Sequence, residues 1–61
     1  MPNLTTKELA ALEDHISSEQ ELIKKYQAYA QMSSDPQIKN KCEQMASQHQ
    51  NHYDRLMSQL N

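Results

Sequence analysis

Three residues of this chain carry side chains that bind metal ions, and their spacing indicates that they can act together. His49 and His52 are three positions apart, so both imidazoles project from one face of a helix. Glu19 supplies a carboxylate from an earlier part of the chain. Two imidazole nitrogens and one carboxylate form a ligand set that proteins use for zinc and for open non-haem iron sites. These three residues are the candidate metal ligands.

A second interpretation of the same residues needs no metal. A carboxylate that is buried alone is costly, and a histidine partner compensates it as a metal ion does. Glu19 can therefore form a hydrogen-bonded pair with a histidine that only fixes the register of two helices. Cores of helical bundles commonly host metal sites, so both interpretations stay open at this point.

The residues that position this set belong to two long helices. Thr5 followed by Glu8 is a capping-box sequence, in which each side chain satisfies a backbone N–H of the other residue. Residues that favour helix continue from there without a breaker, which predicts a first helix over about 5–33.

A short hinge separates the two helices. The hinge is predicted at 34–35, since Asp35 is a favourable N-cap and Pro36 suits the first helical position. The second helix is predicted over about 36–60. A hinge this short makes the helices antiparallel neighbours, so the chain is predicted to be all-α, a single helical hairpin domain over 1–61.

Apolar residues repeat along both helices with the spacing of left-handed helix packing. The two predicted core stripes consist of Leu9, Leu12, Ile16, Glu19, Ile23, Tyr26 and Ala30, and of Ile38, Cys42, Met45, His49, His52 and Leu56. Because the hinge lies at positions 34 and 35, residues that face each other have numbers summing to about 69. Glu19 is therefore expected opposite position 50, between His49 and His52.

The chain is expected to associate with copies of itself. Its 61 residues include no Trp, Phe or Gly, and with a mean hydropathy of −1.01 they cannot enclose a large core. Further apolar residues widen the stripes, and these are Leu22, Tyr29, Ala46, Tyr53, Met57 and Leu60. A homodimer forming a four-helix bundle, or a higher homo-oligomer, would cover them.

Composition also excludes several classes of function. Without Gly the chain has no dinucleotide fingerprint and no phosphate-binding loop. A net charge of −2 and a pI near 5.8 argue against a nucleic-acid partner. No apolar run is long enough for a membrane partner, and the single cysteine, Cys42, fits an intracellular, reducing compartment.

Two further residues have more than one interpretation. His15 lies one turn before Glu19 and can be an outer ligand, or a residue that hydrogen-bonds to a ligand without binding the metal. A lone histidine at a helix edge is more often a half-buried surface residue. Cys42 lies on the second stripe, about 10 Å along the helix from His49, which is too far to share one metal ion. It is interpreted as a small buried hydrophobic residue.

The segments LTTKELAALEDHISSEQELIKKYQAYA and CEQMASQHQNHYDRLMSQL resemble the spore coat protein F-like family, a ferritin-like helical group of endospore-forming bacteria. The motifs that carry the resemblance are LTxKE, LIKKY, DPxxK and HQxH. The resemblance covers nearly the whole chain, from Leu4 to Leu60. It implies a ferritin-like bundle, a bacterial spore-coat location and other spore coat proteins as partners.

The chain departs from the ferritin-like pattern at one ligand position. Ferritin-like di-metal sites use a Glu on one helix and Glu-x-x-His on the next, repeated twice. Glu19 and His52 match this pattern, but His49 stands where the second Glu would be. A site with fewer carboxylates suits an oxidised di-iron centre less well and fits zinc, nickel, copper or ferrous iron better. Ferroxidase activity is therefore not expected.

Three functions remain open from the sequence. The first is a structural, metal-binding module that works as a homo-oligomer, and the second is a ferritin-like redox enzyme. The third is a metal-free adaptor that docks a larger protein. Beyond the candidate ligands the sequence shows no nucleophile–base pair and no oxyanion device, which favours the first function and leaves enzyme activity undecided.

Overall fold

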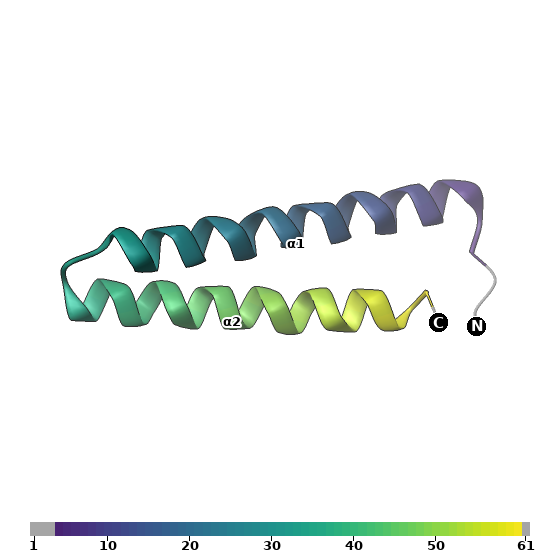
Figure 1. The fold of residues 1–61 in the computed structure, drawn as a ribbon. Coiled ribbons are helices and arrows are strands. Elements are labelled where there is room, and N and C mark those ends of the chain that lie inside the picture. Colours follow the sequence, from purple (N-terminus) through teal and green to yellow (C-terminus); the bar gives the residue numbers. More distant parts are fainter. Residues whose placement is uncertain (1–3, 61) are drawn as a thin grey trace.

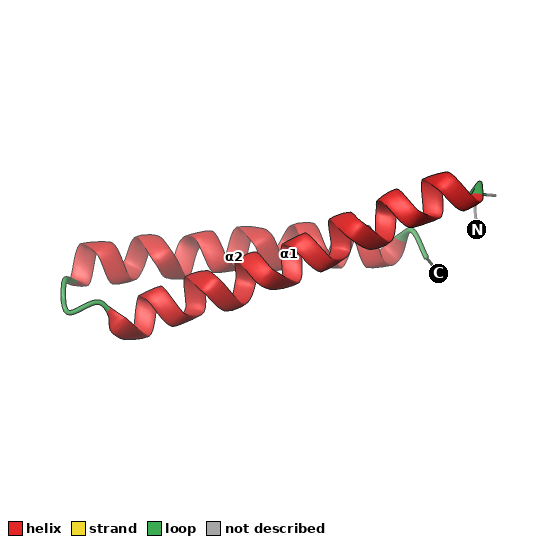
Figure 2. Ribbon diagram, turned by 90° about the horizontal axis from the view of Figure 1, so that it is seen from above, coloured by secondary structure: helices red, strands yellow, loops and turns green. Residues whose placement is uncertain are grey.

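The protein folds as two antiparallel α-helices joined by a short hinge, in a computed structural model that describes residues 4–60 (Figure 1). The helices are α1, Thr6–Met32, and α2, Pro36–Ser58, and they run side by side in a molecule 46 Å long (Figures 1 and 2). The predicted all-α hairpin is thus confirmed. Within 4–60 neither helix is long and apolar enough to cross a membrane.

The start of α1 has the predicted capping box. The backbone N–H of Glu8 donates to Thr5 Oγ1 at 3.1 Å, and the N–H of Thr5 donates to Glu8 Oε1 at 3.0 Å. The helix ends at Met32, where the N–H of Ser33 donates to the carbonyl of Tyr29 at 3.1 Å. The cap at each end of α1 determines where the helix begins and stops.

The hinge is held by hydrogen bonds of Asp35. Its carboxylate accepts from the backbone N–H of Gln37 at 2.8 Å and of Ile38 at 3.4 Å, which caps α2 as predicted. The N–H of Asp35 donates to the Ser33 hydroxyl at 3.2 Å, which closes the turn from the other side. The regular helix then ends at Ser58, two residues before the predicted end, because residues 59–60 form a turn.

The centre of the core agrees with the predicted stripe of α1. Its buried residues are Ile16, Glu19, Ile23 and Ala30, all of which belong to that stripe. Leu9, at the N-terminal end of the stripe, is 38% exposed, since α2 ends before it can cover this position. Within residues 4–60 the core is therefore narrow, and Glu19, its buried charged residue, lies near its middle.

The core line of α2 differs from the predicted one. The buried residue of α2 is Ala46, which was placed beside the stripe, whereas Ile38 is 54% exposed and His52 is exposed. Cys42 is half-buried rather than buried. Ala46, rather than Ile38 or His52, therefore lies on the line of α2 that faces α1. Ile38 and His52, on the side of the predicted stripe away from Ala46, consequently face the edge of the hairpin.

Asp35→Ala tests the capping of α2 at the hinge. Loss of the N-cap is expected to lower the free energy of unfolding by about 1 kcal/mol. Ser34→Ala, at the neighbouring exposed position, is the matched control and should stay within about 0.5 kcal/mol of the wild type. Urea denaturation followed by circular dichroism measures both variants, and equal losses would contradict the capping role.

Candidate metal centre

The candidate centre is built around a glutamate that is more buried than any neighbouring polar side chain. Glu19 is 5% exposed and lies near the middle of α1, on the line that faces α2. His49 and His52 lie on the facing stretch of α2, as the hinge register predicted. The cost of burying a carboxylate is lowered when charged or hydrogen-bonding partners surround it.

His49 is the closest partner of this carboxylate. Its Nδ1 lies 2.6 Å from Glu19 Oε1, which is a short, charge-assisted hydrogen-bond distance. An ionised carboxylate can only accept, so the ring nitrogen donates and the proton is on Nδ1. The His49 side chain is 18% exposed, so this bond is largely shielded from water.

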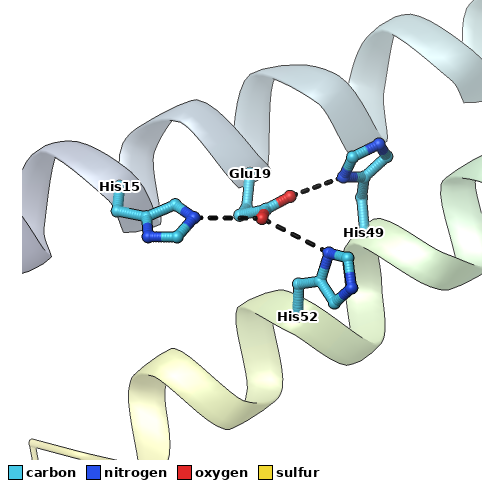
Figure 3. Close-up of polar contacts among 4 residues, drawn as sticks. All are labelled: His15, Glu19, His49 and His52. Carbon is cyan, nitrogen blue, oxygen red and sulfur yellow. Dashed lines mark hydrogen bonds and ion pairs between the residues drawn. The ribbon is translucent and has the colours of Figure 1, made fainter.

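Two more imidazoles approach the other carboxylate oxygen (Figure 3). His52 Nδ1 lies 3.5 Å and His15 Nε2 lies 3.4 Å from Glu19 Oε2. Both side chains are considerably more exposed than His49, at 49% for His52 and 58% for His15. The structure thus brings together the three residues predicted from the sequence. His15, for which a role beside the ligands was one of the interpretations, contacts the same carboxylate.

Tyr26 stacks on His49, a contact that the sequence analysis did not predict. The two rings are parallel, with an interplanar angle of 2° and centroids 5.8 Å apart. His52 meets the same imidazole edge to face, with centroids 5.7 Å apart. Tyr26 lies seven residues after Glu19 on the same helix face, about 10 Å along α1, so the spacing alone does not predict that its ring reaches His49.

The pKa of Glu19 reflects two opposing effects. Burial penalises the charged carboxylate and by itself raises the pKa. The hydrogen bond from His49 and the charges of His49, His52 and His15 together lower it by more, so the pKa of Glu19 lies below its ordinary value of 4.5. Glu19 is therefore ionised at neutral pH and available as an anionic metal ligand.

The donor atoms fit a metal ion after a small adjustment. Glu19, His49 and His52 each offer one ligand atom, and these atoms lie within 4.8 Å of one another, so the group is able to hold a metal ion. Ligands of a tetrahedral ion with bonds of about 2.0–2.1 Å lie about 3.3 Å apart, so the His49–Glu19 contact has to lengthen. Metal binding at Nδ1 of His49 also requires the ring proton to be on Nε2.

The site opens into a hollow between the helices. This hollow has a volume of about 560 Å³. Besides the four polar residues of the site it is lined by Arg55, Leu56 and Gln59. A metal ion has direct access to the carboxylate from this side.

Comparison with protein-family models finds no match, and comparisons with curated proteins and with solved structures also find none. The resemblance to the spore coat protein F-like family therefore stays a prediction. The geometry around Glu19 is the basis on which function can be argued.

The lowered pKa of Glu19 predicts how stability depends on pH in metal-free buffer. The pKa of the Glu19 carboxyl is lower in the folded chain than in the unfolded chain, so its ionised form stabilises the fold. This stability is fully present above about pH 4.5 and is lost as the pH falls through the folded-state pKa. We expect Glu19→Gln to flatten this dependence in urea denaturation at a series of pH values. The pKa of Glu8 is also lowered, by its bonds to Thr5, and that contribution remains in the variant.

Glu13→Gln is the control, because it removes an exposed carboxylate from the same helix. The unfolding free energy of both variants is compared with the wild type at acidic pH. If Glu19→Gln and Glu13→Gln change its loss toward low pH equally, the imidazole contacts of Glu19 do not stabilise the fold.

Proposed function

We propose that this chain is a small structural helical protein that self-associates and binds a divalent transition-metal ion through Glu19, His49 and His52. The observation that carries the proposal is a carboxylate only 5% exposed on which imidazoles from both helices converge. Two nitrogens and one oxygen suit zinc, nickel or ferrous iron better than ions that prefer all-oxygen ligands.

The metal has a structural use in a hairpin with so little core. In the described part of the chain the buried apolar residues are Ile16, Ile23, Ala30 and Ala46, and two of these are alanines. A metal ion that joins α1 to α2 stabilises the folded state by its binding free energy, because the unfolded chain has no preformed site. Metal binding therefore supplies stability that the narrow core does not.

One side of the hairpin is suited to a second copy of the chain. Helical spacing places Leu22 and Tyr29 on the side of α1 that carries His15, and places Ile38 and Leu56 on the side of α2 that carries His52. The opposite side forms a groove with mostly polar lining, including Gln27, Gln31, Lys39, Glu43, Ser47 and Gln50. The apolar side is therefore the side on which a partner would pack.

A dimer interface of standard size needs only a modest share of the hairpin's surface. A standard interface buries about 800 Å² per partner, which is about one sixth of the 4792 Å² that the hairpin exposes. Tyr29 is 45% exposed and Ile38 is 54% exposed, so both have apolar area to bury. Packing of two hairpins on this side gives the proposed four-helix bundle, with the metal sites within its core.

The resemblance to the spore coat protein F-like family supplies the proposed setting. In that setting the chain would act among the coat proteins of a bacterial endospore. A helical module whose fold is reinforced by metal fits a structural part in such an assembly.

Zinc titration tests the metal site. At a free zinc concentration of 100 times Kd, the wild type should gain about 2.7 kcal/mol in unfolding free energy. His49→Ala and His52→Ala should remove most of that gain, since each deletes one ligand. Gln48→Ala, at an exposed position beside His49, should keep it. A wild-type chain whose stability does not change with zinc or with chelator would contradict the metal site.

Sedimentation tests the self-association. We expect the wild type to be a dimer at micromolar concentration and Tyr29→Glu to be a monomer, because the variant buries a charge in the proposed interface. Gln27→Glu introduces the same charge on the polar side and should remain dimeric. A monomeric wild type, or equal dissociation of both variants, would exclude the proposed interface.

A further inference from the structure

Each helix contributes a pair of metal-binding side chains one turn apart. His15 and Glu19 are separated by four residues on α1, and His49 and His52 by three residues on α2. Figure 3 shows the two pairs facing each other, with His15 on one side of the carboxylate and the α2 imidazoles on the other. Helices commonly bind zinc through two side chains four positions apart, as in the two histidines of H-E-x-x-H.

The distances around Glu19 Oε2 are those of ligands rather than of hydrogen-bonded partners. His15 Nε2 lies 3.4 Å and His52 Nδ1 lies 3.5 Å from this oxygen. Hydrogen bonds between nitrogen and oxygen are typically about 2.7–3.2 Å long. Two ligands of one tetrahedral ion with bonds of about 2.0–2.1 Å are about 3.3 Å apart. Both imidazoles are thus already near ligand spacing from the same carboxylate oxygen.

His15 is also free to complete a coordination shell. Its side chain is 58% exposed and contacts the carboxylate of Glu19. Turning the ring toward the α2 imidazoles therefore requires no repacking of the core. His49, at 18% exposure and stacked on Tyr26, has much less freedom to move.

We propose that His15 is the fourth metal ligand, so that one hairpin holds one divalent ion between Glu19 and three imidazoles. This inference rests on the proposed metal-binding function and names the complete ligand set of that site. A tetrahedral ion with four protein ligands has no open position for water or substrate, which is the arrangement of structural zinc sites. The site then connects α1 and α2 through two ligands from each helix.

A competing role for His15 is that of a positioning residue, which holds Glu19 by a hydrogen bond while two imidazoles bind the ion. The variants His15→Ala and His15→Gln separate the two roles. Glutamine keeps an N–H donor for the carboxylate but replaces the imidazole ligand. A positioning role is therefore rescued by Gln, and a ligand role is not.

X-ray absorption at the zinc edge, on the full chain loaded with one equivalent of zinc, counts the imidazoles directly. We expect three in the wild type and two in both His15→Ala and His15→Gln. Zinc affinity should fall in both variants by more than the roughly 10- to 100-fold typical of outer-shell partners. Circular dichroism checks that the variants, altered at an exposed position, keep the helical fold.

The possible failures are distinguishable. Two imidazoles in zinc-loaded wild type, or wild-type affinity in His15→Gln, would overturn the assignment of His15 and leave the metal site of Glu19, His49 and His52 in place. A wild-type chain that binds no zinc would overturn both this inference and the proposed function.

Discussion

A carboxylate that is buried between two helices has to be compensated, and in this hairpin the compensation comes largely from the facing helix. Glu19 is 5% exposed, and His49 on α2 donates to it at 2.6 Å. A slide of α2 by one turn would move His49 about 5.4 Å along α1 and separate it from the buried carboxylate of Glu19. The Glu19–His49 contact therefore favours one register of the two helices, in addition to any part it has in binding metal.

The same contact connects stability to function. The core beside it consists of small and medium-sized side chains, so the hairpin gains little from apolar burial alone. The caps at Thr5 and Asp35 define the ends of the helices but do not hold them together. We propose two sources for the remaining stability: a metal ion at the Glu19 carboxylate and a second copy of the chain on the apolar side. Both involve the side of the hairpin that carries His52.

The register along the helices could be predicted from the sequence, because it depends on the hinge position and a fixed rise per residue. Those two quantities placed Glu19 opposite position 50, and both His49 and His52 contact its carboxylate in the structure. Rotation about the axis of α2 was less well predicted, because its apolar stripe is wide enough to allow several orientations. In the observed orientation Ala46 is the buried residue of α2, and Ile38 and His52 are exposed. The stacking of Tyr26 on His49 also depends on this rotation, so the spacing alone did not reveal it.

A crystal structure of the zinc-loaded protein, with anomalous scattering recorded at the zinc edge, tests most directly that the buried carboxylate is a metal ligand. We expect an anomalous peak about 2.0–2.2 Å from a carboxylate oxygen of Glu19 and from nitrogens of His49 and His52. We also expect the His49–Glu19 distance to be longer than the 2.6 Å of the metal-free contact. A crystal grown in zinc that has no peak at this position and keeps the short hydrogen bond would contradict the assignment of Glu19 as a metal ligand.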